Sequence, residues 1–91
     1  MKKGRKQAIR HIQQLGLPEE VALGLPRLLL RGDSSLSLEN HQGILEYGNT
    51  LIRLRTACGV LSIEGEGMTL AQMGKHDLLL HGTIRTIRYQ P

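Results

Sequence analysis

After Pro26 the chain is a series of short segments rich in leucine and isoleucine, separated by glycine, asparagine or aspartate. Apolar and polar residues alternate within many of these segments, as in strands with one buried face. The separating residues tolerate the positive φ angles of tight turns. The pattern predicts seven or eight short strands, at residues 27–31, 35–39, 43–47, 50–56, 60–64, 68–72, 77–81 and 83–89.

Alternation within these segments assigns side chains to the two faces of the sheet. In 50–56, Ile52 and Leu54 share one face, and in 60–64 the same holds for Leu61 and Ile63. We expect Leu61 and Ile63 to form the centre of the core, because their segment alternates most regularly. Ser62, between them, is expected to face solvent.

Two further details concern the curvature of the sheet. A pair of apolar residues followed by glycine occurs twice, as Leu61-x-Ile63-x-Gly65 and Leu78-x-Leu80-x-Gly82, which favours rungs of a curled sheet. The three-residue spacing of Ile84 and Ile87 breaks the period of two and predicts a bulge near Arg85. Residues 65–67 are interpreted as a turn between two strands.

The predicted fold class is all-β, a mainly antiparallel sandwich or short solenoid-like roll. Helical crossovers do not fit between the segments, which excludes a parallel α/β sheet. A sheet that does not close into a barrel has edges, and we assign these to 27–31 and 83–89. Such edges favour self-association, so a homo-oligomer is expected.

The first residues follow a different pattern. Ala8, Ile9, Ile12 and Leu15 recur at spacings of three and four, which predicts a short amphipathic helix ended by Gly16. The chain therefore divides into a basic helical arm at 1–16 and a single small β domain at 17–91. Ninety-one residues leave no room for a second domain.

Positive charge is concentrated in that arm. Residues 1–14 contain no acid and five basic residues: Lys2, Lys3, Arg5, Lys6 and Arg10. The remainder has seven basic and eight acidic residues, so the net charge of +4 belongs to the arm. Such a segment binds an anionic membrane, a partner or nucleic acid, or is simply a solvated arm. The balanced charge of the β domain makes nucleic-acid binding the weaker alternative, because nucleic-acid-binding domains spread positive charge over the folded surface.

Composition excludes several classes of protein. The chain has two tyrosines and no phenylalanine or tryptophan, which argues against a stacking platform for single-stranded nucleic acid. One cysteine cannot form an internal disulfide, and no apolar run is long enough to cross a bilayer. We expect an intracellular protein.

Candidate chemistry is sparse. The four histidines lack the paired spacing of zinc sites, and Cys58 has no neighbouring base that would make it a nucleophile. The sequence Gly65-Glu66-Gly67 is unsuited to phosphate, because no helix is predicted after it and Glu66 repels anions. We expect no catalytic residue, no metal, no cofactor and no enzymatic activity.

The most distinctive polar cluster is Glu39-Asn40-His41, between two apolar segments. In one interpretation, Asn40 and His41 bond backbone groups in a corner of the fold. In the other, the three residues form a recognition patch for a partner. Both interpretations remain open at this stage.

The order of these pieces resembles the YabP/YqfC family of bacterial sporulation proteins over nearly the whole chain. The resemblance is carried by Leu23-Gly24-Leu25-Pro26-Arg27, Glu39-Asn40-His41 with Gly43, Gly59-x-Leu61-x-Ile63-x-Gly65-x-Gly67, and Leu78-Leu79-Leu80 with Gly82. It implies a small non-enzymatic protein made in the mother cell of an endospore-forming bacterium. The implied location is the cytoplasm of the mother cell, peripheral to the forespore outer membrane. The implied partner is a YqfD-like sporulation membrane protein, and no catalytic residues carry over from the family.

Overall fold

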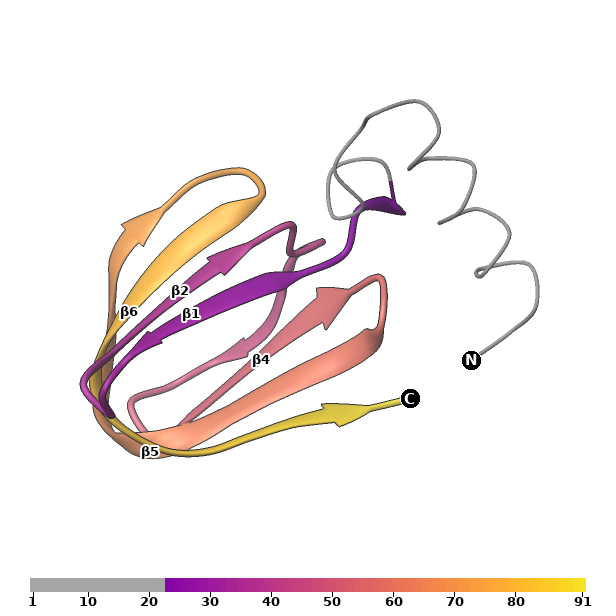
Figure 1. Ribbon diagram of the computed structural model, residues 1–91. Coiled ribbons are helices and arrows are strands. Elements are labelled where there is room, and N and C mark those ends of the chain that lie inside the picture. Colours follow the sequence, from indigo (N-terminus) through magenta and orange to yellow (C-terminus); the bar gives the residue numbers. More distant parts are fainter. Residues whose placement is uncertain (1–22) are drawn as a thin grey trace.

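The computed structural model describes residues 23–91, and within that part the elements are six antiparallel strands (Figure 1). They are β1 (Arg27–Arg31), β2 (Ser35–Glu39), β3 (Ile44–Tyr47), β4 (Leu51–Thr56), β5 (Gly59–Met73) and β6 (Asp77–Gln90). The predicted all-β antiparallel class is confirmed. The predicted helical arm at 1–16 lies outside the described residues, together with its five basic side chains.

The number of strands differs from the prediction in one respect. Segments 60–64 and 68–72 are the two halves of the single strand β5, and segments 77–81 and 83–89 are the two halves of β6. The turn predicted at 65–67 is therefore wrong. Glycine at these positions lets each strand bend sharply without ending, so a turn-like composition lies inside a continuous strand.

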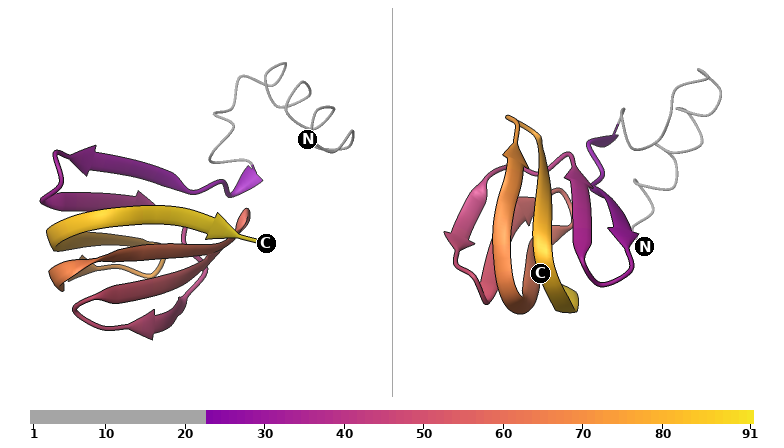
Figure 2. Two further views of the ribbon diagram at one scale, coloured as in Figure 1. Left: turned by 90° about the horizontal axis from the view of Figure 1, so that it is seen from below. Right: turned by 90° about the vertical axis from the view of Figure 1, so that its left-hand side faces the viewer.

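The long hairpin of β5 and β6 organises the whole sheet, whose strand order is β1-β2-β6-β5-β4-β3. Both long strands bend at mid-length, so the sheet folds over on itself into two facing layers (Figure 1). One layer holds β1, β2 and residues 77–81 of β6 with 69–73 of β5. The other holds β3, β4 and residues 59–64 of β5 with 84–90 of β6, and Figure 2 shows this last segment running alongside β5.

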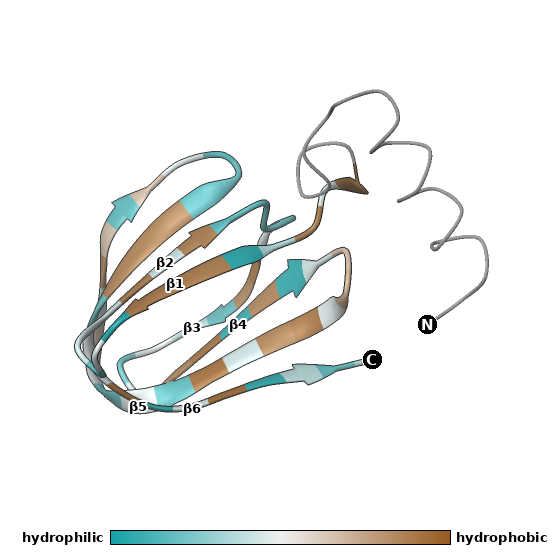
Figure 3. Ribbon diagram, viewed as in Figure 1, coloured by the Kyte–Doolittle hydropathy of each residue, from teal (hydrophilic) through white to brown (hydrophobic). Residues whose placement is uncertain are grey.

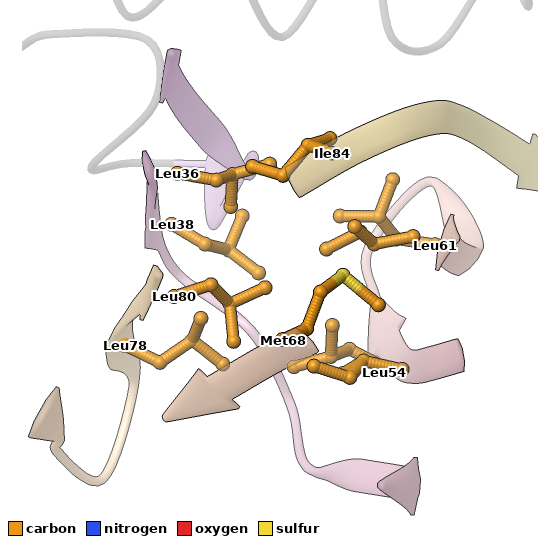
Figure 4. Packing of buried hydrophobic residues seen from close by; sticks show 10 residues of the cluster. Leu36, Leu38, Leu54, Leu61, Met68, Leu78, Leu80 and Ile84 are labelled. Carbon is orange, nitrogen blue, oxygen red and sulfur yellow. The ribbon is translucent and has the colours of Figure 1, made fainter. Parts of the chain in front are cut away.

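The hydrophobic core lies between the two layers. Apolar and polar residues alternate along much of β4 and β5 (Figure 3), and Ile52, Leu54, Leu61 and Ile63 point into the core. The buried side chains of the two layers pack against one another between the layers (Figure 4). Ten side chains, each at most 8% exposed, form this core: Leu36, Leu38, Ile52, Leu54, Leu61, Ile63, Met68, Leu78, Leu80 and Ile84. Leu61 and Ile63 are fully buried, which confirms the predicted register of that segment.

Gly65 and Gly82 allow the two bent strands to approach each other closely. A Cβ atom on Gly65 would overlap the carbonyl oxygen of Thr83 in β6. A Cβ atom on Gly82 would lie 2.7 Å from the Cα of Met68 in β5, and Gly82 also has a φ of +141°. The glycine that follows each apolar pair in the sequence thus marks the bend of each strand.

The short hairpins cap these bends through backbone hydrogen bonds. In the β1–β2 turn, the Asp33 carbonyl accepts the Ile84 N–H at 2.7 Å and the Ser34 carbonyl accepts the Gly82 N–H at 3.1 Å. The β3–β4 turn does the same for β5, because the Thr50 carbonyl accepts the Gly65 N–H at 3.0 Å. Donors that the bend removes from the sheet ladder are thereby satisfied.

The predicted bulge is confirmed at Arg85. Glu64 faces Thr86 across the β5–β6 ladder, whereas the next residue, Gly65, faces Ile84. Arg85 is therefore the extra residue on β6. This explains why the apolar residues Ile84 and Ile87 are three apart in the sequence.

Ser62 lies on the outer face as predicted, but the expectation that it faces solvent is wrong, because it is only 3% exposed. It pairs with Arg53 in β4 and with Arg88 in β6. These long side chains flank the small serine and are held by ion pairs, Arg53 to Glu46 at 3.6 Å and Arg88 to Glu64 at 2.5 Å. The aliphatic stems of arginine cover neighbouring surface in this way.

We predict that Ile63→Ala lowers the free energy of unfolding by about 2–5 kcal/mol, because it leaves a cavity between the two layers. Arg55→Ala, at an exposed position of β4, should change the free energy of unfolding by less than about 0.5 kcal/mol. Denaturant melts of both variants measure the difference. Equal losses would contradict the assignment of the core.

A second prediction tests the bend. Gly65→Ala should cost more than about 2 kcal/mol, because the added methyl group requires the β6 backbone at Thr83 to move. Gly48→Ala is the matched control: its Cβ would make an ordinary contact at 3.5 Å, so the change should be within about 0.5 kcal/mol of neutral. Thermal unfolding of both variants is the measurement, and a tolerated Gly65→Ala would refute the close crossing.

Candidate functional site

The crossover corner, residues 39–43, carries the chain from β2 in one layer to β3 in the other. Its backbone depends on Asn40, which has a φ of +68° and is the only residue other than glycine with a positive φ within residues 23–91. Asparagine tolerates this left-handed conformation better than most residues. The sequence Glu-Asn-His followed by glycine is therefore explained first by backbone geometry.

Hydrogen bonds tie this corner to two other segments. The N–H groups of Asn40 and His41 both donate to the carbonyl of His76, at 2.6 and 3.1 Å, in the turn between β5 and β6. The Asn40 side-chain amide donates to the Leu25 carbonyl at 2.8 Å, just before β1. The corner thus joins segments that are far apart in the sequence.

His41 is the buried member of the cluster, at 2% exposure. Its Nδ1 accepts the Gly43 N–H at 3.1 Å, so in the neutral ring the proton is assigned to Nε2. Nε2 is buried and has no hydrogen-bond partner among the described residues. The ring therefore acts as a structural acceptor that closes the corner. Beyond it, the Gln42 N–H donates to the Arg55 carbonyl and the Arg55 N–H to the Gly43 carbonyl.

These contacts confirm the interpretation in which Asn40 and His41 bond backbone groups in a corner. Glu39 is separate from them, exposed at the end of β2, where it faces Arg27 on one side and Asp77 on the other. A hollow of about 260 Å³ lies beside the corner, lined by Gly24, Asn40, His41, Gln42 and His76. Recognition of a partner by the three residues stays a prediction.

The described part of the chain gathers few groups with catalytic chemistry. Nowhere in residues 23–91 do three histidine, cysteine or acidic side chains come together to hold a metal ion. Cys58 is exposed in the turn between β4 and β5. Partial burial raises the pKa of the Tyr89 phenol above its ordinary value of 10.0, and the nearby Cys58 raises it further. Tyr89 therefore stays protonated at neutral pH.

Sequence reasoning missed how much apolar surface remains outside the core. Large side chains are exposed on the two outermost strands, with Leu29 at 64% and Leu30 at 49% in β1, and Tyr47 at 52% in β3. The Tyr47 hydroxyl accepts the Leu70 N–H at 3.2 Å, so it caps a backbone group of β5. The predicted edge at 27–31 is confirmed, since β1 pairs with β2 alone. The second predicted edge, at 83–89, is wrong, because β6 lies between β2 and β5 and the other outermost strand is β3. Residues 83–89 pair with β5 alone only because β2 ends opposite residues 77–81.

Comparison with known proteins gives the family. The model of the YabP family matches residues 24–91, which is almost all of the described domain. The chain belongs to the YabP family. This YabP-family chain is also 32% identical over 75 residues to the uncharacterized protein YqfC of Bacillus subtilis (strain 168). The matched region covers 82% of this chain and 81% of YqfC, so the similarity includes most of the folded sheet and extends before it.

Within residues 23–91 of this YabP-family chain, no helix has the length and apolar character needed to span a membrane. The family match begins at Gly24, one residue from where the described structure begins. The family match therefore coincides with the described β domain.

The corner yields a prediction that separates conformation from hydrogen bonding. Asn40→Gly keeps access to the positive φ and loses the side-chain bond to Leu25, so it should cost about 1 kcal/mol. Asn40→Ala loses both and should cost about 1 kcal/mol more. Chemical denaturation of the two variants gives the comparison. If alanine is tolerated better than glycine, backbone strain does not explain this residue.

Proposed function

We propose that this YabP-family chain is a non-enzymatic sporulation protein of an endospore-forming bacterium. In this proposal it is made in the mother cell and acts at the cytoplasmic side of the forespore outer membrane. Its partner there is a membrane protein like YqfD. The proposal is supported by membership of the family over residues 24–91 and by what the resemblance to sporulation proteins implies.

The observation that carries the proposal is that the domain matched by the family model has an open sheet edge of the kind that binds other proteins. The sheet presents an open edge at β1, with Leu29 and Leu30 exposed, and an outer face of arginines and glutamates on β4, β5 and β6. Exposed apolar residues at an edge strand are typical of surfaces that bind another chain. The β domain is in this view the partner-binding unit.

The basic segment supplies the membrane side of the proposal. Lys2, Lys3, Arg5, Lys6 and Arg10 occur within the first ten residues, before the β domain. Basic residues close to an anionic membrane contribute about 1 kcal/mol each. Five of them are enough for reversible attachment of a small domain, while the sheet edge stays available for a protein partner.

Gene deletion with complementation tests the biological role. Loss of the chain from its host should reduce the yield of heat-resistant spores, and expression from a mother-cell promoter should restore it. Expression from a forespore promoter is the matched control and should fail to restore it. Normal spore yield in the deletion strain, or rescue only from the forespore, would refute the proposal.

Pull-down from sporulating cells tests the partner. A tagged chain should retain the YqfD-like membrane protein from detergent extracts and should retain it equally after nuclease treatment. Extracts from cells lacking that membrane protein provide the control for nonspecific binding. Binding that disappears with nuclease would favour nucleic-acid binding by the basic segment instead.

We predict that removing residues 1–10 weakens binding to vesicles containing anionic lipid and leaves thermal unfolding nearly unchanged. The five charges lost act together on an anionic surface, whereas the hydrophobic core lies in residues 36–84. Vesicle sedimentation at two salt concentrations measures the effect, and neutral vesicles are the control. Equal binding by the full and shortened chains would end the membrane interpretation.

A further inference from the structure

We propose that the free edge of β1 binds an extended segment of a partner protein as an added antiparallel strand. The segment is apolar at its centre and acidic at both flanks. This inference rests on the proposed function only for the identity of the partner. The chemistry of the segment follows from β1 itself.

The edge offers unpaired backbone groups. β1 is the first strand of the sheet and pairs with β2 alone, so its other side has no strand within the described residues. The Arg31 carbonyl accepts the Ser34 N–H, so Arg31 faces β2. Backbone groups alternate along an antiparallel strand, and the N–H and C=O groups of Leu28 and Leu30 therefore point away from the sheet.

The side chains of β1 leave this edge apolar. Leu29 is 64% exposed and Leu30 is 49% exposed, and Figure 3 shows β1 as an apolar strand between polar ends. Natural edge strands are commonly protected by an inward-pointing charge, a proline or a bulge. The three residues between the end arginines of β1 are all leucines, so none of these devices interrupts the strand.

Charge determines which segment fits. Arg27 and Arg31 lie at the two ends of β1, on the same face as Leu29, and both are exposed. Neither forms an ion pair with a described residue, unlike Arg53 and Arg88 on the other layer. An added strand places its side chains directly opposite those of β1, where opposite charges stabilise and like charges destabilise. Acidic residues at both flanks therefore match the two arginines.

The same arginines disfavour a second copy of this chain as the occupant. In an antiparallel pair of two β1 strands, the register that joins all five residues places Arg27 opposite Arg31 of the copy at both ends. Sliding the copy by two residues removes this repulsion but leaves only three residues paired. A heterologous acidic segment avoids both penalties.

A defined peptide tests the inference. The probe is a fluorescent peptide with the core Glu-Val-Ile-Val-Glu between serine and glycine spacers, and the control peptide has lysine in place of both glutamates. Fluorescence anisotropy with the full chain should show binding at least about tenfold tighter for the glutamate peptide at low salt. Equal affinity for the two peptides would overturn the proposal.

Backbone methylation distinguishes strand addition from simple charge attraction. In the expected register, the second and fourth residues of the core lie opposite Leu30 and Leu28, and their N–H and C=O groups face β1. Methylating these two nitrogens should abolish binding, whereas methylating the third nitrogen should change it by less than about threefold. Equal effects at all three positions would show that no strand is added.

Charge reversal on the protein completes the test. Arg27→Glu with Arg31→Glu should lose binding of the glutamate peptide and gain binding of the lysine peptide. Arg55→Glu with Arg85→Glu makes the same change in net charge at exposed positions outside β1 and should leave the preference unchanged. Circular dichroism of both variants checks that they fold. An unchanged preference after reversal in β1 would place the binding elsewhere.

Two outcomes separate this inference from the proposed function. If peptide binding fails while deletion still impairs sporulation, the edge is not the docking surface and the proposed function stands. If binding succeeds while deletion has no effect on spores, the edge binds acidic segments and the proposed function is wrong. Arg31→Glu alone would set a glutamate opposite Arg27 of the copy at both ends of a β1–β1 pair, so a dimer in sedimentation that this single change strengthens would show that β1 binds a second copy instead.

Discussion

The close crossing of β5 and β6 at their bends is the constraint on which the rest of the structure depends. Gly65 and Gly82 let two backbones approach where side chains would keep them apart. Because both strands bend there, one sheet becomes two facing layers, and a chain without phenylalanine or tryptophan can enclose a core of leucine, isoleucine and methionine. Aliphatic side chains of this size fill the narrow space between two layers.

The bends also explain how the short hairpins are used. A strand that bends sharply loses part of its ladder, and the freed N–H groups must find other acceptors. The β1–β2 and β3–β4 turns provide them, at Asp33 and Ser34 on one side and at Thr50 on the other. The crossover corner has a similar role, since Asn40 and His41 bond the His76 carbonyl at the far end of the β5–β6 hairpin. The polar residues that stand out in the sequence thus serve mainly to satisfy backbone groups.

Much of this fold could be predicted from the sequence, because alternation within a strand is a local signal. The bounds of β1 and β2, the buried pair Leu61 and Ile63, and the bulge at Arg85 all follow from it. The bends could not be predicted, because a glycine that permits a turn and a glycine that permits a close crossing look the same until the opposite strand is known. The predicted exposure of Ser62 was wrong for the same reason, because the burial of this residue depends on Arg53 and Arg88 in neighbouring strands.

The candidate site likewise contains features that could be predicted from the sequence and features that could not. The sequence singled out Asn40 and His41, whose roles depend on positive φ and on local hydrogen bonds. The exposure of Leu29 and Leu30 could not be predicted, because three consecutive leucines look like a buried strand. The edge position of residues 27–31 was predicted and is confirmed by the sheet order, whereas the exposed fraction of its leucines follows only from the packing of the folded chain.

The position of β6 in the sheet has a consequence for synthesis of the chain. β6, the last of the described strands to be synthesised, lies between β2 and β5, in the middle of the strand order. The β1–β2 hairpin and the three-stranded β3–β4–β5 unit are complete earlier, but their inner strands, β2 and β5, stay unpaired on one side until residues 77–90 arrive. Pairing across such sequence separation is slow, and unpaired strands are exposed to aggregation meanwhile. Folding of this domain is therefore completed only after β6 has been synthesised, and β2 and β5 each lack one neighbour until then.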